Sequence, residues 1–323
     1  MIDHAPNHCQ HARTKKCGVT TAGTQRYKCL DCGKRFTAST NQLAGMRIDL
    51  AKATQILTML CEGMSVAATA RLTNTNKNTI LDLLLLVGYR CQQFLSRAIR
   101  GLEVSDVQCD EIWQFIYCKN KNALKAWVYG RREACGDSWT FTAVERHTKL
   151  VLAWHFGKRT SADTDVFCAK LKYATKGRFH MSTDGYRPYE QSIARYFAGQ
   201  VDYGQLIKIF GKSSAEDQRQ YSPARIISTR KEVVMGAPDE DRICTSHTER
   251  QNGSMRCFNK RLGRLTYCFS KKWQNHEAAL GLYFAHYNFC HKHRTLKGQS
   301  PAMAAGLTDH VWTVAELLTA IAA

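Results

Sequence analysis

Three acidic side chains lie where the surrounding sequence makes an acid unexpected. Asp110 and Glu111 interrupt residues 107–117, an apolar and aromatic stretch that is typical of a β-strand. Asp184 ends a second strand-like stretch, and Gly185 follows it where the chain must turn. A carboxylate in a buried strand is costly unless a cation or hydrogen bonds compensate for it. The pattern therefore predicts that these acids face a cation.

A further acid, Glu249, lies in a helical stretch that is otherwise basic. Asn252 and Arg256 follow it at spacings that return to the same helix face. A carboxylate, an amide and a guanidinium in a row could hold a metal ion at one end and a phosphate at the other. The alternative interpretation is a solvated helix on which Glu249 and Arg256 are too far apart to interact.

Acids from two strands and one helix can converge on divalent metal ions. We expect Asp110, Asp184 and Glu249 to hold two Mg²⁺ (or Mn²⁺) ions, which could activate a water or a 3′-hydroxyl and stabilise the leaving oxygen of a phosphodiester. Glu111 must point to the opposite strand face from Asp110. We therefore treat Glu111, Asn252 and Arg256 as auxiliary residues.

Several motifs of the chain together resemble those of the DDE transposases of the first insertion-sequence type. They are Asp110-Glu111-x-Trp113, Thr183-Asp184-Gly185-x-x-x-Tyr189-Glu190, Glu249-Arg250-x-Asn252 with Arg256, Phe269-Ser270-Lys271-Lys272, and the N-terminal Gly23-Thr24-Gln25-Arg26-Tyr27-Lys28-Cys29-x-x-Cys32. Each motif is weak alone, but the set is specific and extends from about residue 4 to about residue 305.

The resemblance implies a DNA transposase with an RNase H-like catalytic domain. Such an enzyme binds terminal inverted repeats, cleaves 3′ ends and joins them to target DNA by two-metal-ion phosphoryl transfer. No covalent protein–DNA intermediate is expected, and Arg256 would hold a phosphate or position Glu249. The alternatives are a sequence-specific DNA-binding regulator with an inactive catalytic core and a nuclease of the same fold.

Composition favours a polyanionic partner. The 323 residues carry a formal net charge of +19, with basic residues in every segment rather than in one tail. The N-terminus lacks the apolar region of a signal peptide, and no apolar run is long enough to span a bilayer. Fourteen cysteines without an export signal indicate reduced thiols. We expect no membrane partner and a cytoplasmic, nucleoid-associated protein.

The first 40 or so residues contain a pattern that is typical of a zinc site. Cys29 and Cys32 flank a tight turn that Gly33 relaxes. We expect one structural Zn²⁺, with Cys9 and His4 as the second ligand pair, and the spacing leaves His8, His11 and Cys17 as rivals for that pair. A domain this small would need the metal in order to fold.

Residues 49–98 have helical patterns. Asp49, Ser65 and Asn76 are placed to begin three helices, with a turn at residues 73–75. This spacing indicates a helix-turn-helix, and an ordinary helical bundle is the alternative. In the whole chain we expect these residues to contact DNA: Arg26, Lys28, Lys34, Arg35, Asn76, Lys77, Asn78, Thr79, Arg250, Lys260, Arg264, Lys271 and Lys272.

From residue 105 the pattern changes to strands and then to alternating strands and helices, as in a mixed sheet flanked by helices. Residues 213–241 are polar and suggest a loop near DNA. The predicted fold is a multidomain α/β protein. Its parts are a zinc finger (1–42), a helix-turn-helix domain with linker (43–104), an RNase H-like catalytic domain (105–308) and a helical tail (309–323).

The implied reaction also predicts an assembly. One chain carries one set of acids, whereas transposition joins two element ends to one target, so we expect a homo-oligomer of at least two chains on double-stranded DNA. The apolar surfaces of residues 273–288 and 89–104 are candidate interfaces. The alternative is that both surfaces pack within one protomer.

Overall fold

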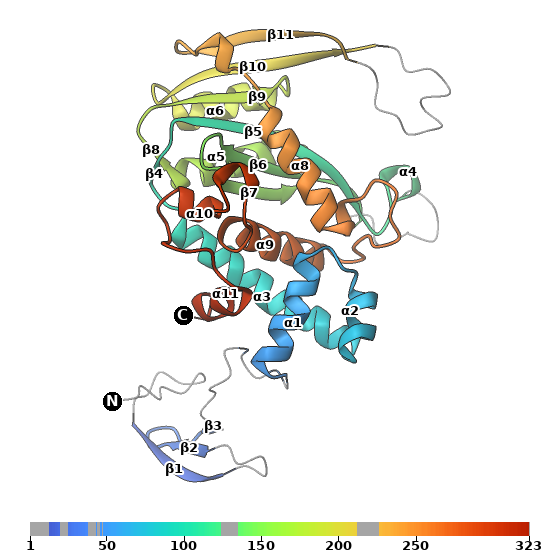
Figure 1. The fold of residues 1–323 in the computed structure, drawn as a ribbon, viewed down its shortest axis with the longest axis vertical. Coiled ribbons are helices and arrows are strands. Elements are labelled where there is room, and N and C mark those ends of the chain that lie inside the picture. Colours follow the sequence, from blue (N-terminus) through green and yellow to red (C-terminus); the bar gives the residue numbers. More distant parts are fainter. Residues whose placement is uncertain are drawn as a thin grey trace. The chain divides into compact units, whose positions relative to one another are not determined.

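The computed structural model (Figure 1) has a mixed α/β fold with two compact units, Met1–Leu50 and Ala51–Ala323. It describes residues 13–19, 25–37, 43, 46, 48–123, 135–211 and 226–322.

The first unit contains a three-stranded antiparallel sheet. Its strands are β1 (Thr14–Val19), β2 (Gln25–Cys29) and β3 (Arg35–Thr37). The rings of Tyr27 and Phe36 stack across β2 and β3 with centroids 5.7 Å apart. The turn between these strands carries Cys29 and Cys32, and Gly33 there has a φ of +73° that other residues rarely adopt. The expected tight turn at this pair is therefore confirmed.

The second unit begins with three helices, α1 (Leu50–Cys61), α2 (Val66–Thr73) and α3 (Lys77–Ala98). The predicted caps of the second and third helices are confirmed, because Ser65 accepts a hydrogen bond from the Ala68 amide and Asn76 accepts one from the Asn78 amide. Helix α3 continues to Ala98, so most of residues 89–104, which were expected to continue the helices or link them to the catalytic domain, are helix.

A six-stranded mixed sheet forms the centre of the second unit, in the order β11-β10-β9-β5-β6-β7. Strands β5, β6 and β7 are antiparallel, β5, β9 and β10 are parallel, and β11 returns antiparallel to β10. The bounds are β5 (Asp106–Ile116), β6 (Gly136–Glu145), β7 (Val151–Gly157), β9 (Phe179–Asp184), β10 (Val201–Phe210) and β11 (Ile226–Met235).

Helices cover the sheet, and α8 crosses one face in front of β5 (Figure 1). The larger helices of this region are α5 (Ser161–Ala174), α6 (Pro188–Phe197), α8 (Ser246–Phe258) and α9 (Trp273–Phe289). The shorter elements are β4 (Leu102–Glu103), α4 (Asn120–Ala123), β8 (Thr175–Lys176), η3 (Glu240–Arg242), η4 (Lys260–Leu262), η5 (Arg294–Leu296), α10 (Pro301–Ala304) and α11 (Val314–Ala320). The predicted mixed sheet with flanking helices is confirmed.

The predicted polar loop at residues 213–241 is wrong in part. Residues 226–235 form β11, which pairs with β10 from Tyr203↔Met235 to Phe210↔Ile226. This edge strand is mostly exposed, so it lacks the apolar alternation by which sequence patterns reveal strands. Residues 213–225 of that loop lie outside the described residues. So do residues 126–132, where the strand pattern that begins at residue 105 predicts a strand.

Helices α3 and α9 pack tightly against each other. A Cβ atom at Gly88 would lie 2.2 Å from the Ala278 carbonyl oxygen, and one at Gly281 would lie 2.6 Å from that of Gly88. Phe94 also contacts Phe289, with ring centroids 5.0 Å apart. The two segments proposed as an interface between protomers therefore cover much of each other's surface within one chain.

No helix in the described part of the chain is long and apolar enough to cross a membrane. The three N-terminal helices of the second unit belong to the same compact unit as the sheet. The domain boundaries at residues 42, 104 and 308 stay predictions.

Candidate active site

Two adjacent parallel strands bring the first two predicted acids together. The ladder between β5 and β9 runs from Asp106↔His180 to Gln108↔Ser182. Asp110 and Asp184 each lie two residues beyond that last pair, so they reach the same level of the sheet. Together with Glu111 they form a group whose ligand oxygens all lie within 4.8 Å of one another.

Glu111 joins this group, which the analysis of the sequence did not predict. As expected from strand alternation, Asp110 contacts Asn252 of α8, whereas Glu111 contacts Arg159, which precedes α5. The carboxylates of both faces nevertheless meet because they lie where the β5–β9 ladder has ended. Glu111 is therefore placed as a ligand candidate of equal standing with Asp110 and Asp184, not as a residue of the opposite face alone.

Alternate residues of β5 anchor the chain segment that leads into α8. Asp106 accepts hydrogen bonds of 3.2 Å from Arg242, and the Gln108 side chain accepts one of 2.9 Å from the His247 amide. Asp110 accepts a hydrogen bond of 2.7 Å from the Asn252 side chain. The period of two along a strand therefore aligns α8 with the acidic group.

Glu249 lies close to the acidic group but is not a member of it. Its carboxylate accepts a hydrogen bond of 2.6 Å from the Thr245 hydroxyl and pairs with the ammonium of Lys208 on β10. About half of its side chain is exposed. The predicted convergence of Asp110, Asp184 and Glu249 thus holds for the first two acids in this conformation, while Glu249 is held by a lysine.

Three cations border the acids. Arg159 donates a hydrogen bond of 2.9 Å to Glu111 and lies 3.8 Å from an oxygen of Asp184. Lys208 pairs with Glu249 and is close enough to lower the pKa of both Asp110 and Asp184. Arg256 lies near enough to Asp110 to be influenced by its charge, and its buried Nε has no hydrogen-bond partner among the described residues.

The acids of the group favour their protonated forms when no metal is bound. Burial raises the pKa of Asp110 to about 7, and the charge of Asp184 adds to the shift. Burial, with the charges of Asp184 and Asp110, raises the pKa of Glu111 to about 8. Burial opposes ionisation of Glu249 too, but hydrogen bonds from Lys208 and Thr245 lower its pKa below the usual value.

This group fits a divalent metal ion with a preference for oxygen ligands. Its three carboxylates offer hard oxygen donors and no thiolate or imidazole. The Glu111 Oε2 and Asn252 Oδ1 atoms are buried without hydrogen-bond partners in the described structure, as expected of oxygens with capacity for a ligand. A bound dication would also offset the mutual repulsion that raises the acid pKa values. The residues could therefore hold a metal ion.

The predicted zinc ligands are described only in part. Cys29 and Cys32 lie close together at the turn after β2, where Cys29 is buried and Cys32 exposed. His4 and Cys9, with the rivals His8 and His11, lie outside the described residues. Within the described chain Cys17, on β1, does not complete a three-residue group with the cysteine pair. The ligand set stays a prediction.

Most of the predicted DNA-contacting residues are exposed. This holds for Arg26, Lys34, Arg35, Lys77, Asn78, Arg250, Lys260, Arg264, Lys271 and Lys272, while Lys28 and Thr79 are half-buried. Asn76 is also exposed, but its side chain is occupied in capping α3. Contacts with DNA stay predictions for all of them.

Comparisons with known proteins do not identify the chain. No protein-family model matches it, and no curated protein is significantly similar to it. The site itself therefore has to indicate the function. Two residues of that site, Arg159 and Lys208, were missed because nothing in their local sequence distinguishes them from other surface cations.

Proposed function

We propose that the chain is a metal-dependent DNA transposase with an RNase H-like catalytic domain. The observation that carries the proposal is the group formed by Asp110, Glu111 and Asp184. A cluster of acids inside a chain with a net charge of +19 is suited to a cationic ligand, and the excess of cations elsewhere suits a polyanionic substrate. Metal-dependent phosphodiester chemistry on DNA accounts for both features.

In this proposal the acidic side chains would bind metal ions, and a neighbouring arginine would bind DNA. Two Mg²⁺ (or Mn²⁺) ions bound here would supply an activated water or 3′-hydroxyl and stabilise the leaving oxygen. Asp110, Asp184 and Glu111 or Glu249 would provide the carboxylate oxygens. Asn252 orients Asp110 through its 2.7 Å hydrogen bond. The unpartnered Nε of Arg256 is suited to a DNA phosphate beside the acids.

The remaining parts of the chain would recognise the element ends. The N-terminal unit, with one zinc ion at Cys29 and Cys32, and the helices α2 and α3 in a helix-turn-helix arrangement would bind the terminal inverted repeats. Because two ends must be joined to one target, the working particle would contain at least two chains on DNA. A cytoplasmic, nucleoid-associated location belongs to the same proposal.

One observation favours the alternative of a DNA-binding regulator or a nuclease without strand transfer. Glu249 is paired with Lys208 rather than gathered with the other acids. If that pair persisted with DNA and metal bound, the site would lack one acid of the expected triad. Separate measurements of binding, cleavage and joining of labelled ends distinguish these functions.

Replacing the acids tests the proposal directly. Asp110→Asn, Asp184→Asn and Glu249→Gln should each abolish Mg²⁺-dependent cleavage and joining of labelled element ends, because metal coordination needs charged oxygens. Binding of the same ends should change less than about threefold, since Lys and Arg supply most of the affinity. Glu111→Gln tests whether the newly placed acid is also required.

The control is Glu232→Gln, because Glu232 lies on the exposed strand β11 and pairs with Arg230. This variant makes the same chemical change outside the site and should leave joining intact. Normal joining by the Asp110 or Asp184 variant would exclude the proposed chemistry. Cleavage without joining by the wild-type chain would identify a nuclease, and binding alone would identify a regulator.

A further inference from the structure

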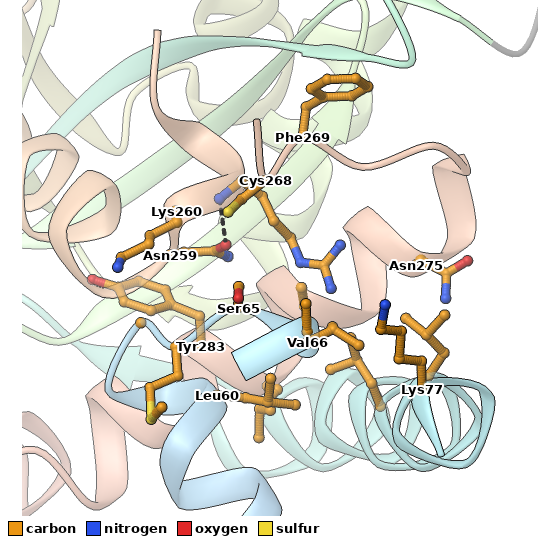
Figure 2. A pocket seen from close by; sticks show the side chains of 18 of the residues that line it. Leu60, Ser65, Val66, Lys77, Asn259, Lys260, Cys268, Phe269, Asn275 and Tyr283 are labelled. Carbon is orange, nitrogen blue, oxygen red and sulfur yellow. Dashed lines mark hydrogen bonds between the residues drawn. The ribbon is translucent and has the colours of Figure 1, made fainter. Parts of the chain in front are cut away.

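A groove of ≈ 780 Å³ lies between the N-terminal helices of the second unit and the segment that follows α8 (Figure 2). One wall comes from α1, α2 and α3, and the others from residues 258–272 and α9. In Figure 2, Lys77 and Lys260 lie on opposite sides of the groove, with Ser65 and Val66 between them. None of the acids of the candidate active site lines it, so the groove is a separate feature.

The charged side chains that line the groove are mostly cationic. Its cationic lining residues are Lys77, Lys260, Arg261, Lys271 and Lys272. Among the described residues that line it, Asp82 alone is acidic. An anionic ligand would therefore meet a favourable potential at this surface.

Arg261 is the cation that most needs an anion. Its Nη1 donates a hydrogen bond of 3.0 Å to the buried Ser270 hydroxyl, whose oxygen also lies 2.9 Å from Nδ1 of the buried His276. No carboxylate forms an ion pair with Arg261 in the described part of the chain. Burial lowers the pKa of this guanidinium. A half-buried cation that is held by a hydrogen bond, and that has no ion-pair partner among the described residues, is expected to bind an anion from outside the chain.

Two helix N-termini add to this preference. Residues Ser65 and Val66 at the start of α2, and Lys77 and Asn78 at the start of α3, line the same groove. Ser65 and Asn76 already cap the Ala68 and Asn78 amides, so the helix dipoles supply most of this preference for negative charge.

The floor of the groove is apolar, which a phosphate alone would not require. Leu60, Leu81, Leu282 and Tyr283 contribute to it. Tyr267, in the loop beside it, is fully exposed to solvent. A duplex presents phosphates to such a surface but keeps its base faces stacked inside. An unstacked nucleotide presents both an anionic phosphate and a flat apolar base.

We propose that this groove binds an unpaired nucleotide of a DNA strand, with a phosphate at Arg261 and the base against the apolar floor and Tyr267. The volume lies within the range of about 300–1,000 Å³ that is usual for ligand sites. The inference rests on the proposed function for its substrate class, since DNA is the polyanion that the whole chain is suited to bind. It adds that the protein takes one nucleotide out of the duplex or binds a single-stranded end.

The test measures binding of a fluorescein-labelled ten-nucleotide dT strand to the full chain by anisotropy, at about 0.2 M salt to suppress non-specific binding. Divalent metal is omitted, so no chemistry takes place. Arg261→Gln should weaken binding about tenfold or more, because it removes a charge-assisted hydrogen bond. Arg97→Gln is the matched control, since Arg97 is exposed on α3 outside the groove and loses the same charge. It should change affinity less than about twofold.

Two further measurements test whether the base is bound and whether another class of anion binds instead. Tyr267→Ala removes an exposed ring and should weaken binding of dT about fivefold or more, but not binding of an abasic strand of equal length. It also keeps the proposal testable if Arg261→Gln does not fold, which circular dichroism and thermal unfolding would reveal. A ten-residue polyglutamate peptide serves as a competing anion of a different class.

The outcomes are decisive in either direction. Equal losses for Arg261→Gln and Arg97→Gln, or equal affinities for the dT and abasic strands, would overturn the proposal. Arg261-dependent binding of polyglutamate but not of dT would replace the nucleotide by an acidic protein segment. Because the measurement needs no cleavage or joining, a chain that failed as a transposase could still pass this test, and an active transposase could fail it.

Discussion

At the scale of single residues, specific cations form ion pairs with the acids of the candidate site and with Glu249. Arg159 pairs with Glu111 on one face of β5, and Lys208 pairs with Glu249 beside the other acids. A divalent ion would compete with both cations for the same carboxylates. Metal binding and the redistribution of these ion pairs should therefore be linked.

The raised pKa values predict how the metal-free protein responds to pH. Asp110 and Glu111 have a pKa of about 7 and about 8 in the folded chain, well above their unfolded values of about 4. Between those limits the folded state binds more protons at these two carboxyls than the unfolded state, so the stability that they contribute is complete below about pH 4 and falls as pH rises to about 8. Between pH 5.5 and pH 8 the melting temperature of the metal-free protein should therefore decrease by at least about 2 °C relative to that of Asp110→Asn.

Asp110→Asn is the control for this pH dependence, because the amide does not titrate. The variant keeps the other titrating groups, including six histidines whose pKa values are lowered by burial, so the difference between the two melting temperatures isolates the carboxyl. Mg²⁺ should raise the wild-type value most at pH 8, where protons no longer compete. A difference between the two melting temperatures that stays constant from pH 5.5 to pH 8 would show that Asp110 is not buried beside the other acids.

Lys208 offers a second prediction at this scale. Lys208→Met removes a positive charge that interacts with Glu249, Asp110 and Asp184. Mn²⁺ should then bind about tenfold more tightly in a titration followed by electron paramagnetic resonance, since a competing cation is gone. Lys292→Met, at an exposed position, is the matched control. Weaker binding in the Lys208 variant would instead mean that Lys208 positions Glu249 as a ligand.

At the scale of elements, the site depends on how β5 meets its neighbours. The strand ladder sets the level of Asp110 against Asp184, and three alternate side chains of β5 align the approach to α8. Below the sheet, α9 is almost wholly buried and α3 packs along it through Gly88 and Gly281. The helices that line the groove are thereby held against the part of the same unit that carries the acids.

This crossing predicts a steep cost for a small substitution. Gly88→Ala would place a Cβ atom 2.2 Å from the Ala278 carbonyl oxygen, so the helices must move apart. The free energy of unfolding should decrease by about 2 kcal/mol or more, as measured by urea denaturation. Gly253→Ala on α8 is the control, because its Cβ would have nothing within 4 Å and alanine favours a helix. Equal stability of the two variants would contradict the close packing.

At the scale of the whole molecule, two compact units divide the chain at Leu50 and Ala51. The first has a small core, in which Tyr27 and Cys29 are the buried residues of its sheet. The second contains a large apolar core within and around its mixed sheet. Units of such different core size should differ in how they obtain their stability.

Removing the predicted zinc ion tests whether the two units obtain their stability in different ways. Cys29→Ser, or chelation by a zinc-selective chelator, should unfold the first unit and weaken binding to element ends, because a small metal-dependent domain takes its folding free energy from the ion. The second unit should stay folded, which limited proteolysis followed by mass spectrometry would show. Cys244→Ser is the control, as this partly exposed cysteine lies in the second unit. Purified protein that contains less than about half a zinc ion per chain would contradict the site.

The sequence alone determined the features that depend on local chemistry. The apolar and aromatic content of residues 107–117 revealed the strand that carries Asp110, and the caps at Ser65 and Asn76 revealed where two helices begin, because these signals act within a few residues. The placement of Asp184 at a strand end followed from the glycine after it. The pairing of acids with a compensating cation was predictable in kind from the cost of burying charge.

Tertiary structure alone decided which side chains actually meet. The partner of Glu111 is Arg159, 48 residues away in the chain, and the partner of Glu249 is Lys208, 41 residues away. Such contacts depend on strand order and on where each ladder ends, which no local pattern encodes. The same reason explains why β11 escaped prediction: its backbone pairs with β10 while its exposed side chains leave no apolar period to detect.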